Sequence, residues 1–157
     1  MRNVARARLA RHLTCLTSAL LGGLTEARHA NRCPRVRLHG PSTAAQRGAT
    51  VAFTLLSDDG TAVPYWRVEA AARDAGIALR GGCFCNPGCA EQSFGLDDAS
   101  VLPCLQALGD AFSPAALSHC LGGRAVGAIR VSLGCGSVRA DVESLLAFVA
   151  AVRDPVP

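Results

Sequence analysis

Residues 77–95 read IALRGGCFCNPGCAEQSFG, and this stretch decides how the chain is interpreted. Its first four residues predict a short strand, because a small apolar run is closed there by two glycines. The segment 81–88 holds three glycines and Pro87, so we expect an irregular loop. Three thiols lie within seven residues of one another on or beside this loop: Cys83, Cys85 and Cys89.

Three interpretations of the clustered thiols compete. Zinc binds clustered thiolates, but Cys-x-Cys-x3-Cys is not a usual zinc spacing and no matching second pair follows, although Cys104 and His119 could complete a site. Cysteine is also often a small buried hydrophobic residue. We expect that for five others: Cys15, Cys33, Cys104, Cys120 and Cys135.

The third interpretation is a nucleophilic cysteine. A reactive thiolate needs access to solvent and a nearby positive charge or backbone donors. A glycine-rich loop is exposed, and Arg80 stands at its start. This pattern suits sulfur or acyl transfer, and the loop alone does not choose between them.

Outward from the loop, apolar spacing predicts a small sheet covered by helices. We expect helices over 5–24, 64–75, 99–108, 113–121 and 138–152, and further strands over 35–39, 49–56 and 127–133. The first helix is expected to break at Gly22 and Gly23, and its Arg-rich start also suits an organellar transit peptide. The fold class is therefore α/β, as a two-layer α+β domain.

The composition of the chain argues against several classes of function. The chain has 157 residues, one-domain length, and half are hydrophobic. Its 16 basic residues are all Arg, nine of them in the first 47 positions, but they are dispersed and aromatic residues are few, so we expect no nucleic acid partner. We also expect no membrane span, and eight reduced cysteines in a cytoplasmic protein.

Several motifs together resemble the class V aminotransferase and cysteine desulfurase family, most closely the desulfurase-like domain of molybdenum cofactor sulfurases. They are the cysteine stretch, LHGP at 38–41, RGATVAF at 47–53 and VGAIRVSLG at 126–134. The resemblance implies the aspartate-aminotransferase fold, known as fold type I of enzymes that use pyridoxal phosphate. Residues 1–157 would form only the C-terminal small domain, without the large domain that binds the cofactor.

The resemblance also implies roles. Cys85 matches the cysteine that takes the substrate sulfur as a persulfide, and Arg130 matches the arginine that binds the substrate carboxylate. Arg80 would assist the carboxylate or the thiolate, or form a structural ion pair, whereas His39 and His119 are expected to be ordinary histidines. The substrate would be cysteine or a related amino acid, and the product alanine. A sulfur acceptor such as a molybdenum cofactor, and a large-domain partner or homodimer, would complete the system.

One departure from the family is the absence of lysine. Pyridoxal phosphate is held as a Schiff base by a lysine amine, and this chain has none. We therefore expect the chain alone to be inactive, as a fragment, a truncated product or one half of a split enzyme. The alternative is a non-catalytic thiol or zinc-binding module, which stoichiometric zinc on Cys83, Cys85 and Cys89 would favour.

Overall fold

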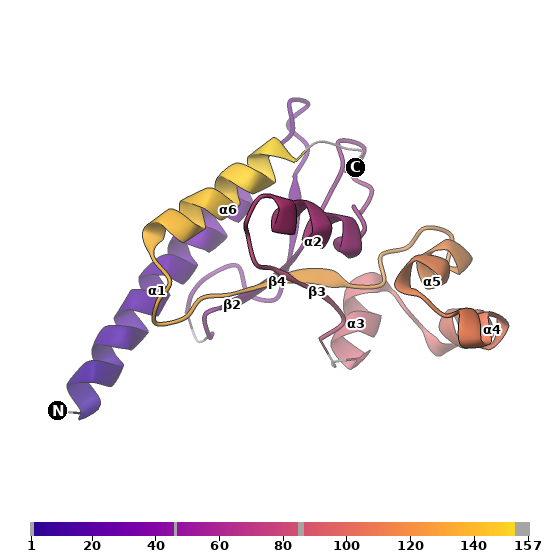
Figure 1. The fold of residues 1–157 in the computed structure, drawn as a ribbon, viewed down its shortest axis with the longest axis horizontal. Helices are drawn as coiled ribbons and strands as arrows, with labels where there is room; N and C mark the ends of the chain where they lie inside the picture. Colours follow the sequence, from indigo (N-terminus) through magenta and orange to yellow (C-terminus); the bar gives the residue numbers. More distant parts are fainter. Residues whose placement is uncertain (1, 46, 85–86, 153–157) are drawn as a thin grey trace.

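The computed structural model describes residues 2–45, 47–84 and 87–152, and a four-stranded antiparallel sheet lies at its centre (Figure 1). The strands run in the order β1-β2-β4-β3. Their bounds are β1 Val36–His39, β2 Thr50–Leu55, β3 Arg80–Gly82 and β4 Ala128–Ser132. The expectation of a small α+β domain is confirmed.

Three helices cover one face of this sheet: α1 (Arg2–Glu26), α2 (Tyr65–Asp74) and α6 (Arg139–Ala151). Alternate residues of the two inner strands point into the core between sheet and helices, as a period of two requires. The fully buried members of this core include Val51, Phe53, Ile129, Leu20, Leu24, Val68 and Val149. The remaining residues of these strands point to the opposite face of the sheet, outside this core.

The sequence predicted a break in α1 at Gly22 and Gly23, and this prediction is wrong. The helix continues through both glycines to Glu26. A Cβ on Gly23 would lie 2.4 Å from Cδ1 of Leu146, so glycine here lets α6 pack closely against α1. Leu20 is fully buried, whereas Leu9 is 41% exposed. The first half of α1 accordingly extends beyond the body of the molecule in Figure 1.

A second, smaller core lies beyond the end of the sheet, under α4 (Asp98–Leu108), the 3-10 helix η1 (Gly109–Ala111) and α5 (Pro114–Cys120). Ser113 caps α5 by accepting a hydrogen bond from the backbone N–H of Ala116, with Pro114 in the first turn, as the sequence predicted. Buried Cys104, Leu121 and Val126 form this core, against which Trp66 of α2 packs.

Three further expectations were wrong. Residues 81–88 are not wholly irregular, because Gly81 and Gly82 pair with β4 as part of β3, and a helix that was not predicted, α3 (Pro87–Phe94), follows. Cys104 and Cys120 form a disulfide, with Cα atoms 5.9 Å apart. The other three cysteines expected to be buried are exposed thiols: Cys15, Cys33 and Cys135.

None of the helices in the described ranges is long and apolar enough to cross a membrane.

Candidate functional site

One row of residues crosses the whole sheet on the face turned away from α1, α2 and α6. His39 pairs with Ala52, Ala52 with Arg130, and Arg130 with Arg80. Directly paired residues of antiparallel strands point to the same side. Ile129, next to Arg130, is buried in the main core, so the row faces outward from that core. The antiparallel register thus brings together two of the three predicted site residues.

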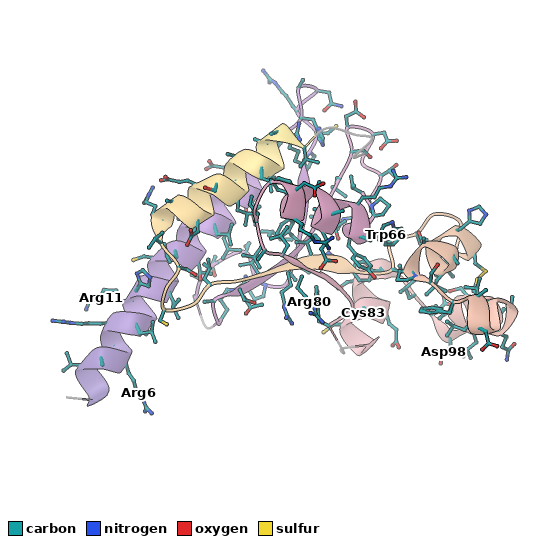
Figure 2. All side chains as sticks on the ribbon, in the orientation of Figure 1. Arg6, Arg11, Trp66, Arg80, Cys83 and Asp98 are labelled. Carbon is teal, nitrogen blue, oxygen red and sulfur yellow. A yellow bond between two sulfur atoms is a disulfide. The ribbon has the colours of Figure 1, made fainter. Side chains whose placement is uncertain are left out.

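Arg130 and Arg80 form a pair of like charges on neighbouring strands. Figure 2 shows Arg80 on the side of the sheet opposite α2 and α6. Within the described ranges, the salt bridge found joins Arg139 to Glu143, and no carboxylate pairs with either site arginine. Like charges placed directly opposite each other repel, so this position favours a bound anion.

The Arg130 side chain is held in place by an aromatic ring, but one of its hydrogen-bond donors has no partner among the described residues. Its guanidinium carbon lies 4.8 Å from the centre of the Phe84 ring, within the range of a cation–π interaction. Its Nε atom is buried and has no hydrogen-bond partner among the described residues. A buried donor without a partner is costly, so Nε is a donor that a ligand oxygen could satisfy.

The backbone that leads from β3 toward the cysteines is strained. Phe84 has a φ of 58°, in the left-handed region that residues with a side chain seldom adopt. Such conformations cost about 1–3 kcal/mol and concentrate at functional sites. Exposed Cys83, one residue earlier, directs its thiol to the carbonyl oxygen of Val126 at 3.7 Å. Two contacts therefore hold the start of this loop, one between Cys83 and Val126 and one between Phe84 and Arg130.

Tyr65 explains two of the glycines in this region. A Cβ on Gly81 would lie 2.2 Å from the Tyr65 ring, and one on Gly127 would lie 2.9 Å from it. Burial raises the pKa of Tyr65, with smaller contributions from the neighbouring Cys83 and Glu69. The ring therefore packs against the backbone of β3 and of the segment just before β4, and it supports the strands that carry the two arginines.

Helix α3 covers part of the outward face and leaves a cavity of about 70 Å³ over the sheet. The His39 ring meets Phe94 of α3 edge to face at 5.2 Å, and its Nε2 atom shares a hydrogen bond of 2.8 Å with Thr54 Oγ1. Burial, and then the nearby charge of Arg37, lower the pKa of His39. The surroundings of His39 thus disfavour its protonated form, and its ring packs against α3. His119 is exposed in the last turn of α5.

The third predicted site residue, Cys85, lies outside the described residues, so the structure gives no position for its thiol. Among the residues that are described, no three His, Cys, Asp or Glu side chains gather closely enough to hold a metal ion. The sequence did not point to Phe84, whose ring lies against Arg130, or to Tyr65, which packs against Gly81 of β3 and Gly127 just before β4. An aromatic residue between two cysteines was the available signal for Phe84.

No family model matches the chain. Curated relatives do. Over 148 residues the chain is 34% identical to molybdenum cofactor sulfurase 2 of Culex quinquefasciatus and 35% identical to the molybdenum cofactor sulfurase of Anopheles gambiae. It is 30% identical over 148 residues to the molybdenum cofactor sulfurase of Bos taurus. Each match covers 90% of this chain.

The chain is much shorter than these relatives. It spans 19%, 18% and 16% of their respective lengths. The resemblance seen in the cysteine stretch and the arginine strand is nonetheless confirmed: over nine-tenths of its length, this chain is homologous to a segment of the molybdenum cofactor sulfurases.

Proposed function

We propose that this chain supplies part of the active site of a sulfur-transferring enzyme, with the substrate-binding arginines and the sulfur-carrying cysteine on one small domain. The names of its relatives support a sulfurase-like role. The observation that carries the proposal is the cross-strand pair Arg80 and Arg130, which faces outward without a carboxylate partner in the described ranges.

The arginine pair suits a carboxylate ligand for physical reasons. A carboxylate placed between two guanidinium groups removes their mutual repulsion and accepts charge-assisted hydrogen bonds from both. The free Nε of Arg130 adds a donor in the plane of its fork, and the Phe84 ring holds that plane. We infer that Arg130 is the main carboxylate ligand of an amino-acid substrate such as cysteine, and that exposed Arg80 assists it.

Pyridoxal phosphate does not fit this chain alone. The sequence has no lysine, so no residue here can hold the cofactor through a Schiff base. We therefore propose no step that passes through the cofactor on this chain. The proposed arrangement is the small domain of an aspartate-aminotransferase type enzyme, whose lysine comes from a large domain or a partner chain.

Cys85 is the proposed sulfur carrier. It follows Phe84 directly in the chain, and Phe84 contacts Arg130. In the complete enzyme, cysteine and the Cys85 thiol would give alanine and a Cys85 persulfide, so that one sulfur atom moves and all other atoms stay balanced. A second thiol or a molybdenum cofactor would then accept the sulfur. These roles rest on the likeness of the cysteine stretch to the family.

Carboxylate binding is the first test. We expect the Nε–H signals of Arg130 and Arg80 in nuclear magnetic resonance spectra to shift on titration with L-alanine, a product-like probe, and not with L-alaninamide, which lacks the carboxylate. Arg130→Ala should abolish the shift at Arg80. Arg139→Ala is the matched control, because Arg139 lies on the exposed α6 surface in its own salt bridge. Equal shifts with both probes would contradict the proposal.

The missing lysine gives the second test. The purified chain, supplied with pyridoxal phosphate and cysteine, should release no alanine, and adding a lysine-bearing cofactor domain should restore the reaction. Robust turnover by the chain alone would show that the division of the active site is wrong.

A further inference from the structure

Large apolar side chains that are exposed gather at the two ends of the molecule. Six are exposed in the described ranges, and five of these lie either on the outer half of α1 or on the segment from α4 to the end of η1. They are Val4 and Leu9 in the first group and Leu102, Leu105 and Phe112 in the second. Figure 1 shows these two parts at opposite ends of the molecule. Gathered apolar side chains, unlike scattered ones, indicate surfaces that a partner covers.

The lobe formed by α4, η1 and α5 carries a groove of about 430 Å³. Leu105 and Phe112 line this groove and are nevertheless 38% and 52% exposed, so it is open to solvent. The disulfide between Cys104 and Cys120 joins α4 to α5, which both contribute lining residues. The groove is therefore present in the single chain, and a partner does not have to create it.

The groove has a negative rim. Segment 87–123 of the sequence holds four carboxylates and no arginine or lysine. Three of these carboxylates line the groove: Glu91, Asp97 and Asp98. Arg124, just beyond the segment, donates a hydrogen bond to the carbonyl oxygen of Gly95 and offsets one of the charges. A partner of this groove therefore needs apolar side chains together with cations.

The outer half of α1 has the complementary chemistry. Residues 4–13 hold no acid and three exposed arginines: Arg6, Arg8 and Arg11. Figure 2 shows Arg6 and Arg11 on the part of α1 that extends beyond the body, at the end opposite Asp98. Leu9 stands among these arginines, and the helix brings Arg6, three residues earlier, to its side. This half of α1 therefore presents an exposed apolar side chain surrounded by cations.

We propose that the outer half of α1 of one copy of this chain occupies the groove on the lobe of a second copy. Leu9 enters the apolar part of the groove, and Arg6 and Arg8 face Glu91 and Asp98 on its rim. Burial of apolar surface supplies affinity, and the opposite charges fix the orientation. Because the two parts lie at opposite ends of each chain, the copies associate head to tail. This contact is independent of the proposed function, since none of the proposed substrate or sulfur ligands takes part in it.

Sedimentation equilibrium of the full chain is the first test. Exposed thiols are blocked with iodoacetamide beforehand, so that disulfides between copies do not contribute. We expect the weight-average mass to rise above that of one copy as the protein concentration increases. Added salt should lower this mass again, because salt screens charges at the surface. The mass of one copy at every concentration would overturn the inference.

Exchange of charges tests the contact itself. Arg6→Glu/Arg8→Glu places an acidic helix against the acidic groove, and Glu91→Arg/Asp98→Arg places the basic helix against a basic groove. Each variant alone should associate about tenfold more weakly than the natural chain, or weaker still, because like charges then meet. An equimolar mixture of the two variants should associate again, because each helix then finds a groove of opposite charge. A mixture that remains as single copies would contradict the proposed contact.

Two matched controls separate this contact from general effects of charge and hydrophobicity. Arg37→Glu/Arg73→Glu changes the net charge as much as the α1 variant does, but on β1 and α2, and should associate like the natural chain. Leu9→Ser should remove association, whereas Val138→Ser, at the sixth exposed apolar side chain, should retain it. Circular dichroism verifies the fold of each variant, and if the groove variant does not fold, the Leu9 and Val138 variants carry the comparison. Equal association of these two variants would overturn the inference.

Discussion

Close packing around Tyr65 fixes the strands that carry the two site arginines. Its ring lies where Cβ atoms of Gly81 and Gly127 would be, and Gly127 also approaches the backbone of Gly82. Backbone atoms cannot move aside as the end of a flexible side chain can. The position of Arg130, three residues after Gly127, therefore depends on the absence of side chains beside Tyr65.

Replacing Gly127 with alanine tests this dependence. The new Cβ would lie 2.9 Å from the carbonyl carbon of Gly82. We expect Gly127→Ala to lower the free energy of unfolding by about 1–3 kcal/mol, the range for overpacked sites, as measured by urea denaturation. Gly134→Ala is the control, because a Cβ there meets nothing within 4 Å. Equal stability of the two variants would contradict the packing argument.

The buried environment of His39 predicts a dependence of stability on pH. Because its folded pKa lies below the ordinary value of 6.5, the folded state binds this proton less readily than the unfolded state. The stabilising contribution is complete above the unfolded pKa and decreases as the pH falls below it. Between about pH 7.5 and about pH 5.5, the free energy of unfolding measured with urea should fall less for His39→Gln than for the natural chain. Arg37, the charged neighbour, is the same in both proteins.

The sequence predicted candidate site residues but not their arrangement. The sequence predicts Arg130 within a strand over 127–133, and the structure places it in β4. Arg80 was expected at the end of a strand over 77–80, whereas it begins β3 and pairs directly with Arg130. Strand register depends on long-range pairing, and the sequence predicts a loop at Gly81 and Gly82 because glycine is a poor strand former. The adjacency of the two arginines could not be derived without that register.

At the scale of elements, the short helix α5 depends on its N-terminal cap. The hydroxyl of Ser113 accepts the backbone N–H of Ala116 at 3.0 Å. We expect Ser113→Ala to cost about 1 kcal/mol of stability, and Ser113→Asn, which keeps an acceptor, to cost much less. Thermal unfolding followed by circular dichroism measures both. If the two substitutions destabilise the chain equally, the cap does not account for the effect.

The sequence did not predict helix α3 or the Cys104–Cys120 disulfide. Each omission has a physical reason. Pro87 and Gly88 indicate a turn, but proline is also favoured in the first turn of a helix, and α3 begins with it. The Cys104–Cys120 bond requires two helices to pack side by side, and sequence spacing does not report that contact. By contrast α6, with its strong apolar periodicity, begins and ends within one residue of its expected bounds.

For the whole molecule, the inner half of α1 is part of the same core as the sheet and α6. Leu24 is fully buried, so Leu24→Ala should lower the free energy of unfolding by about 2–5 kcal/mol through lost contacts and the cavity that remains. Leu9→Ala is the matched control on the same helix, since Leu9 is 41% exposed, and it should change stability little. Urea denaturation of both variants would reveal whether α1 is an integral layer, and similar small losses would show that it is not.

The order of the strands has a consequence for association between molecules. The two outer strands, β1 with four residues and β3 with three, are shorter than the inner strands β2 and β4, with six and five. An unpaired strand edge is the template on which another chain can add a strand, and its capacity increases with its length. The short outer strands thus discourage aggregation by strand addition at the edges of the sheet. The longer, apolar strands β2 and β4 are enclosed between them, where no second molecule can pair with them.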